Sequence, residues 1–161
     1  MFEDYLKQIG LEYLTNNLGK TDLNNFVEST FGKNLPELSE KEINKLYAYD
    51  VPKLSADGSC SILEEKNEIP YDLSKIFGHS PAFTKDLWRL KQIVKNIYDL
   101  TGVDWFGIYK KALNIKKEPV LVKLSYLGLF SRAEFPLTKE FAKKSNNSTV
   151  GQTGKAIVIQ N

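Results

Sequence analysis

DWFGIY (residues 104–109) and PVLVKLSYLGLF (residues 119–130) decide the fold of this chain. Both segments are rich in β-branched and aromatic residues and alternate with the two-residue period of a strand. In the first, one face carries Trp105, Gly107 and Tyr109, and the other face is also apolar, so we predict that both faces are covered. The charged stretch 110–118 between the segments predicts a hairpin connection.

The second segment predicts a half-buried antiparallel strand. Strict alternation places one set of side chains on the core face: Val120, Val122, Leu124 and Tyr126. It places Leu121, Lys123 and Ser125 on the opposite face.

The residues before the first strand predict an amphipathic helix over residues 84–101. Its apolar positions recur at steps of three and four: Leu87, Leu90, Val94 and Ile97. Thr84 suits the N-cap, and Gly102 suits the position that ends the helix.

Residues 1–82 predict a helical N-terminal segment with a long connection, ahead of a second domain over residues 83–161. Apolar spacing predicts two short helices within residues 1–32, and Ser39 with Glu42 matches a capping box that begins a third. Proline and glycine then punctuate residues 51–82, with one helical turn expected at 71–77.

Composition excludes several classes of protein. The 161 residues are 42% hydrophobic and 26% charged, which is ordinary for a globular protein. No apolar run approaches the roughly 18–20 residues of a membrane span, and the acidic N-terminus does not resemble a signal peptide. Cys60 is the single cysteine, so no internal disulfide forms. We therefore expect a cytoplasmic protein without a membrane partner.

Charge is distributed unevenly along the chain. Residues 1–80 carry 8 Lys or Arg and 14 Asp or Glu, whereas residues 81–161 carry 14 and 6. The basic residues of the second half are scattered singly or in pairs and do not cluster, which argues against a nucleic-acid partner. The two halves are therefore expected to pack on each other or on partners of opposite charge.

The second half of the chain resembles the GAF domain family. The resemblance covers residues 84–161 and rests on five features in order: the helix, the DWFGIY strand, the strand ending LGLF (127–130), FPL (135–137) and TVGQTG (149–154). It implies an α+β fold with a central antiparallel sheet flanked by helices and a ligand pocket between the sheet and a connecting helix and loop. The family domain continues for at least two more strands and a helix. The resemblance therefore implies a GAF-like domain incomplete at its C-terminus, and we expect a fragment of a longer chain.

Members of this family bind cyclic nucleotides, tetrapyrroles, small metabolites or metals, and many form dimers. One branch, the free methionine-R-sulfoxide reductases, begins with a similar strand but uses cysteines in a Gly-Val-Cys-Gly context. The matching stretch here, Ser148 to Gly151, reads STVG and has no cysteine. The resemblance therefore favours a non-catalytic sensing or signal-relay module for an unidentified small molecule. The alternatives are a divergent reductase-like enzyme and a ligand-free module for dimerisation.

Candidate ligand-binding residues lie at three places, and each has a structural alternative. Trp105 and Tyr109 could face a ligand or fill the core. Arg132 and Glu134 could fix a polar ligand group or form a salt bridge at the strand end. The third set could bind an anion or carbonyl, or form a turn with positive φ at the glycines: Ser148, Thr149 and Gly151.

The sequence predicts neither a catalytic residue nor a metal site, and it names no cofactor. The single histidine, His79, and Cys60 lie in one long connection, where they could form a nucleophile pair. Turn residues of this kind are more often incidental. One His and one Cys are too few ligands for a metal.

Overall fold

The computed structural model describes residues 36–54, 66–129 and 131–157. The chain divides into two compact units, residues 1–36 and residues 37–161, and the second is the one described below. Three parts of the sequence predictions lie outside the described residues: the two helices within residues 1–32, Cys60 and the strand end at Phe130.

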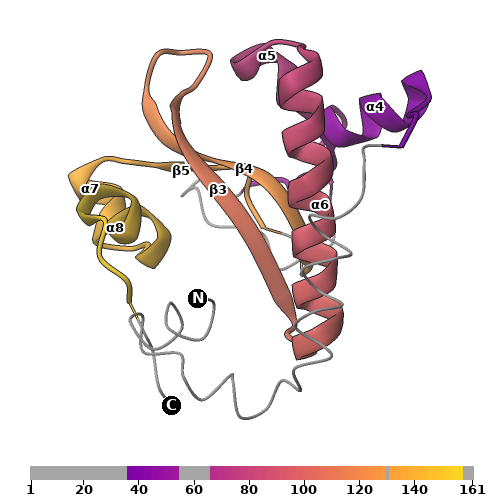
Figure 1. Cartoon of the computed structure of the whole chain (residues 1–161). Coiled ribbons are helices and arrows are strands. Elements are labelled where there is room, and N and C mark those ends of the chain that lie inside the picture. The colour runs from indigo at the N-terminus through magenta and orange to yellow at the C-terminus, as the bar shows by residue number, and fades with distance from the viewer. Residues whose placement is uncertain (1–35, 55–65, 130, 158–161) are drawn as a thin grey trace. The chain divides into compact units, whose positions relative to one another are not determined.

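The predicted pair of strands forms the centre of an antiparallel sheet. Its order is β3 (Trp105–Leu113), β4 (Pro119–Gly128) and β5 (Glu134–Pro136) (Figure 1). β3 extends beyond the predicted end because a short turn closes the hairpin. The Asn114 side-chain oxygen accepts hydrogen bonds from the backbone N–H groups of Lys116 and Glu118, both at 3.0 Å.

The predicted central helix is α6 (Pro81–Thr101). It begins three residues earlier than the sequence predicts, since Ser80 is the N-cap and accepts from the Phe83 N–H at 3.1 Å. Thr84 lies inside the helix instead, where its hydroxyl donates to the Ser80 carbonyl oxygen at 2.9 Å. The predicted end at Gly102 is confirmed, with φ of 63°.

The segment before α6 belongs to the same core as the sheet. It contains α4 (Glu40–Tyr47), β1 (Ala48–Tyr49), β2 (Tyr71–Asp72) and α5 (Ser74–Phe77). The predicted capping box of Ser39 and Glu42 is confirmed at the start of α4. One buried apolar cluster joins α4, the residue between β2 and α5, α6 and β4. Its members are Leu46, Tyr47, Leu73, Leu87, Val120, Val122 and Leu124. The described chain is therefore an α+β fold, as predicted.

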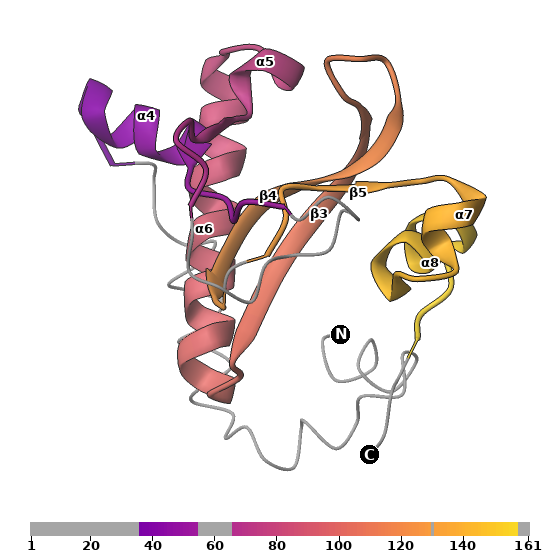
Figure 2. The ribbon, with the colours of Figure 1, turned by 180° about the vertical axis from the view of Figure 1, so that it is seen from behind.

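Helices cover both faces of the three-stranded sheet. α6 packs on the face that carries Val120 and Val122. α7 (Lys139–Ala142) and α8 (Asn146–Thr153) lie on the other side of the sheet, as Figures 1 and 2 show. We call these the α6 side and the α8 side. Gly151 sets the spacing of α8, because a Cβ built there would lie 2.8 Å from Leu121 and 2.7 Å from Leu137.

The prediction that β4 is half-buried is wrong, because its two faces are both covered. Lys123 is fully buried and lies on the α8 side. A β-bulge also changes the facing of the strand end: Tyr109 pairs with Lys123 and Ile108 pairs with Ser125, which leaves Leu124 as the extra residue. Past the bulge Tyr126 pairs with Gly107, so its Cβ leaves the sheet on the α8 side and not on the core face that alternation predicts. Its ring lies against the ring of Tyr49, with centroids 5.9 Å apart.

Candidate functional site

An aromatic row occupies the α8 side of the sheet. The ring centroids of Trp105 and Tyr109 lie 6.2 Å apart, and those of Tyr109 and Phe135 lie 5.3 Å apart in an edge-to-face arrangement. Gly107 makes room for the row, because a Cβ at this position would lie 2.7 Å from the Trp105 ring. The structure therefore brings Trp105 and Tyr109 together on one face, as the strand alternation predicts.

Two buried polar atoms on the α8 side have no hydrogen-bond partner in the described part of the chain. They are the indole nitrogen of Trp105 and the hydroxyl oxygen of Ser148. Ser148 is fully buried and lies one helical turn before Gly151, so it faces the sheet with that glycine. Each buried polar group without a partner costs about 1–3 kcal/mol. A group that supplied the missing hydrogen bonds would recover that free energy.

Hydrogen bonds and cation–π contacts hold the Lys123 side chain next to the aromatic row. Its Nζ donates to the carbonyl oxygen of Ser131 at 2.6 Å and to the Ser131 hydroxyl at 3.2 Å. The same Nζ lies 3.5 Å from the ring centroid of Tyr126 and 5.1 Å from that of Tyr49. Burial of a lysine amine requires such compensation. The lysine therefore fixes the Ser131 loop against β4.

The third predicted set lies on a helix and not in a loop or turn. Thr149 uses its hydroxyl within the helical segment, where Oγ1 donates to the carbonyl oxygens of Ala142 at 2.8 Å and Ser145 at 3.1 Å. Gly151 lies in the interior of α8, and it is Gly154 that adopts positive φ, at 68°. Of these three residues, Ser148 alone presents a hydroxyl without a partner among the described residues.

The structure places Arg132 beside Glu134, at the start of β5. The Arg132 guanidinium lies 4.5 Å from the ring centroid of Phe141 in α7, and its Nε donates to the Glu134 carbonyl oxygen. Glu134 pairs with Val122 in the sheet, and residues directly opposite on two strands share a face. The Glu134 side chain therefore points to the α6 side, away from Trp105 and Tyr109.

Glu134 belongs to a polar cluster at the turn end of the β3–β4 hairpin. Its carboxylate accepts from the Tyr71 hydroxyl at 2.6 Å and from the Asn114 side-chain amide at 3.1 Å. Burial, followed by this hydrogen bond to a carboxylate, raises the pKa of Tyr71 above its ordinary value. Arg132, Glu134 and Tyr71 also line a cavity of about 310 Å³ between the hairpin and residues 51–54. This cavity mixes both charge signs.

Sequence reasoning missed three residues that organise the site. Tyr49 donates to the Lys123 carbonyl oxygen at 2.6 Å, where β4 runs beyond the end of β5. Burial raises the pKa of Tyr49 strongly, and neighbouring phenol and carboxylate groups add to the effect. Tyr71 and Lys123 complete the set. The one local signal for these residues was Lys123 itself, a lysine in the middle of a strand with the aromatic residue Tyr126 three positions later.

Metal ligands do not cluster in the part of the chain that the structure describes. No three His, Cys, Asp or Glu side chains within residues 36–54, 66–129 and 131–157 lie together as metal ligands would. The His79 ring packs on Tyr47, with centroids 4.1 Å apart. No helix in these ranges is both long enough and apolar enough to cross a membrane.

The fold and the site together define an α+β protein with two unpartnered buried donors on the α8 side of its sheet. Comparison with known families, curated proteins and solved structures finds no match to this chain.

Proposed function

We propose that this chain is a GAF-like module that binds a small molecule on the α8 side of its sheet and relays the binding event without catalysis. The observation that carries the proposal is the pair of buried polar atoms without partners, Trp105 Nε1 and Ser148 Oγ. A folded protein rarely leaves such groups unpaired unless another molecule pairs with them. We place the protein in the cytoplasm, with a second copy of the chain as a partner.

The ligand that suits this face is flat and carries a hydrogen-bond acceptor. Trp105 Nε1 can only donate, whereas the Ser148 hydroxyl can donate or accept. The rings of Trp105, Tyr109 and Phe135 supply an aromatic surface for stacking. A planar heterocycle or an aromatic carbonyl compound combines the two properties. The chain lacks the cysteines of the reductase branch at residues 148–151, so we do not assign that chemistry.

Relay requires that the ligand prefer one arrangement of α7 and α8. α8 packs through Gly151 on Leu121 of β4 and on Leu137, and the α7 ring of Phe141 lies 4.5 Å from the Arg132 guanidinium. A ligand that pairs with Ser148 stabilises the docked position of α8. It shifts the equilibrium only by the difference between its affinities for the docked and undocked states.

Ser148→Ala tests the proposal through two opposite effects. Without ligand, the variant removes a buried hydroxyl that has no partner, so the free energy of unfolding should rise by about 1 kcal/mol. When the protein is purified with the small molecule that it bound in the cell, native mass spectrometry should show less bound adduct on the variant than on the wild type. Urea unfolding of ligand-stripped protein gives the first quantity.

Thr149→Val is the matched control. It removes the neighbouring hydroxyl, which is already paired with Ala142 and Ser145, so stability should fall by about 1 kcal/mol while the adduct is retained. An adduct that persists fully on Ser148→Ala, or a loss of stability in that variant, would remove Ser148 from the site.

A further inference from the structure

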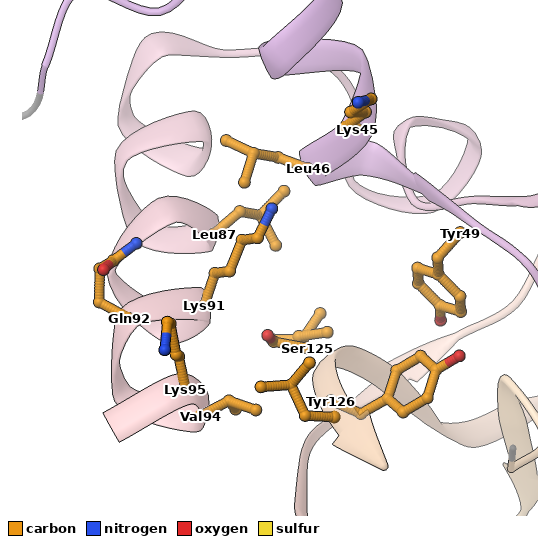
Figure 3. Close-up of a pocket in the computed structure, with 12 residues that line it drawn as sticks. Lys45, Leu46, Tyr49, Leu87, Lys91, Gln92, Val94, Lys95, Ser125 and Tyr126 are labelled. Atoms are coloured by element: carbon orange, nitrogen blue, oxygen red, sulfur yellow. The ribbon is translucent and has the colours of Figure 1, made fainter. Parts of the chain in front are cut away.

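A second cavity lies away from the α8 side, where α4, α6 and the end of β4 meet. Its volume is about 180 Å³ (Figure 3). Buried aliphatic side chains form its floor: Leu46 from α4, Leu87 and Val94 from α6, and Leu124 from β4. A dry apolar cavity of about 150 Å³ is known to accept a benzene molecule. The space is therefore large enough for one aromatic ring or a short alkyl chain.

The rim of this cavity is basic. Lys45 from α4 and Lys91 and Lys95 from α6 stand around the apolar floor, as Figure 3 shows. No carboxylate is among the described residues that line the cavity. Lys95 forms an exposed ion pair with Asp99 one turn along the helix, which leaves Lys45 and Lys91 as the stronger attraction for an anion.

Lys45 and Lys91 come from different elements and converge on the same region. Hydrogen bonds with Ser39 are the main cause of the lowered pKa of Glu42, and the charges of Lys45 and Lys91 both add to it. Glu42 itself is held in the capping box, with Oε2 accepting from the Ser39 backbone N–H at 2.8 Å. The capping box holds this carboxylate at the start of α4, and it is not part of the cavity lining that includes Lys45 and Lys91.

Two tyrosine rings border the far side of the cavity, and their hydroxyls donate to backbone carbonyl oxygens, that of Tyr49 to Lys123 at 2.6 Å and that of Tyr126 to Asp50 at 3.4 Å. Tyr49 and Tyr126 meet edge to face, with centroids 5.9 Å apart, and Figure 3 shows both across the cavity from the α6 lysines. Ser125 lies at the bottom, on the part of β4 that the bulge turns. Apolar floor, aromatic wall and cationic rim match a molecule with an apolar body and one anionic end.

We propose that this cavity binds a small monocarboxylate whose apolar part is about the size of a benzene ring. The apolar part fills the space above Leu46, Leu87 and Val94, and the carboxylate lies between Lys45 and Lys91. Because the occupant contacts α4, α6 and β4 at once, it stabilises their packing by mass action. This site is separate from the face that carries Trp105 and Ser148, and neither proposal depends on the other.

Titration of the full chain with phenylacetate, followed by ¹H–¹⁵N correlation spectra, tests the proposal. We expect saturable shifts confined to residues 45–49, 87–95 and 124–127. The uncharged phenylacetamide should bind at least about fivefold more weakly, because it forms no ion pair. Lys45→Gln with Lys91→Gln should weaken phenylacetate binding about fivefold, since each exposed lysine contributes a modest attraction.

Lys85→Gln provides the matched control, because Lys85 is an exposed α6 lysine that does not line the cavity. Its affinity for phenylacetate should equal that of the wild type. The proposal is overturned if wild type shows no saturable shifts, if phenylacetamide binds as well as phenylacetate, or if the double variant keeps the wild-type affinity. All three lysines are exposed, so the substitutions leave the core intact. A change in affinity therefore reports on binding and not on misfolding.

Discussion

Gly128→Ala will lower the free energy of unfolding by about 3 kcal/mol. Gly128 ends β4 with φ of 94°, a conformation that L side chains rarely adopt. A Cβ added there would lie 2.0 Å from the Asp104 carbonyl oxygen and 2.8 Å from the Trp105 Cα. Backbone atoms cannot move aside as a flexible side chain does, so strain and overpacking add. Urea unfolding of the variant measures the effect.

Gly102→Ala separates the two causes. Gly102 also has positive φ, at 63°, in the left-handed region, but nothing lies within 4 Å of the position of its Cβ. Its alanine variant should cost only about 1 kcal/mol, from backbone conformation alone. Equal losses in the two variants would contradict the close approach of β3 and β4 at Trp105 and Gly128.

Raising the pH from 8 to 11 will lower the free energy of unfolding of the unit 37–161 by about 2 kcal/mol, through Tyr49 and Tyr71. Burial is the main cause that raises the pKa of both phenols above the ordinary value, so both stay neutral in the folded state. In the unfolded chain they ionise near pH 10. Above that pH the unfolded state binds fewer protons, so stability falls as pH rises. Each phenol contributes up to about 1.4 kcal/mol by pH 11, and Tyr71 contributes less because its ring is partly exposed.

The measurement is urea unfolding at both pH values for wild type and for Tyr49→Phe with Tyr71→Phe. The double variant should lose most of the difference in stability between pH 8 and pH 11. Tyr98→Phe, in the last turn of α6 and outside this cluster, should retain it. If the double variant shows the same alkaline loss as the wild type, other groups cause it and the buried positions of these phenols are in question.

Local patterns in the sequence predicted the main elements because local chemistry sets them. The apolar spacing of α6, the capping box at Ser39 and the alternation of DWFGIY each depend on residues a few positions apart. The helix start was misplaced at Thr84 because Ser80 with Pro81 is a stronger N-terminal signal than the one chosen. The facing of Tyr126 depends on the bulge at Leu124, and no residue type marks that bulge.

The candidate site could be predicted only in part. Strand alternation placed Trp105 and Tyr109 on one face, and Ser148 was named for its hydroxyl. The side of the sheet to which Glu134 points follows from the pairing of β5 with β4, which is a long-range property. The same is true of Tyr49 and Lys123, which meet across 74 positions of sequence. Neither Lys45 nor Lys91 is marked by its neighbours, since the cavity they border forms only when α4 packs on α6.

Native mass spectrometry of the full chain, purified without added ligands, tests the central proposal most directly. The chain alone has a mass of 18.3 kDa. We predict an additional species that carries a small-molecule adduct, that loses it on denaturation, and that is depleted in Ser148→Ala but not in Thr149→Val. The mass of the adduct would also lead to the identity of the ligand. Bare chain and its oligomers alone, with no adduct in any preparation and no gain in stability for Ser148→Ala, would contradict the proposal that this face binds a small molecule.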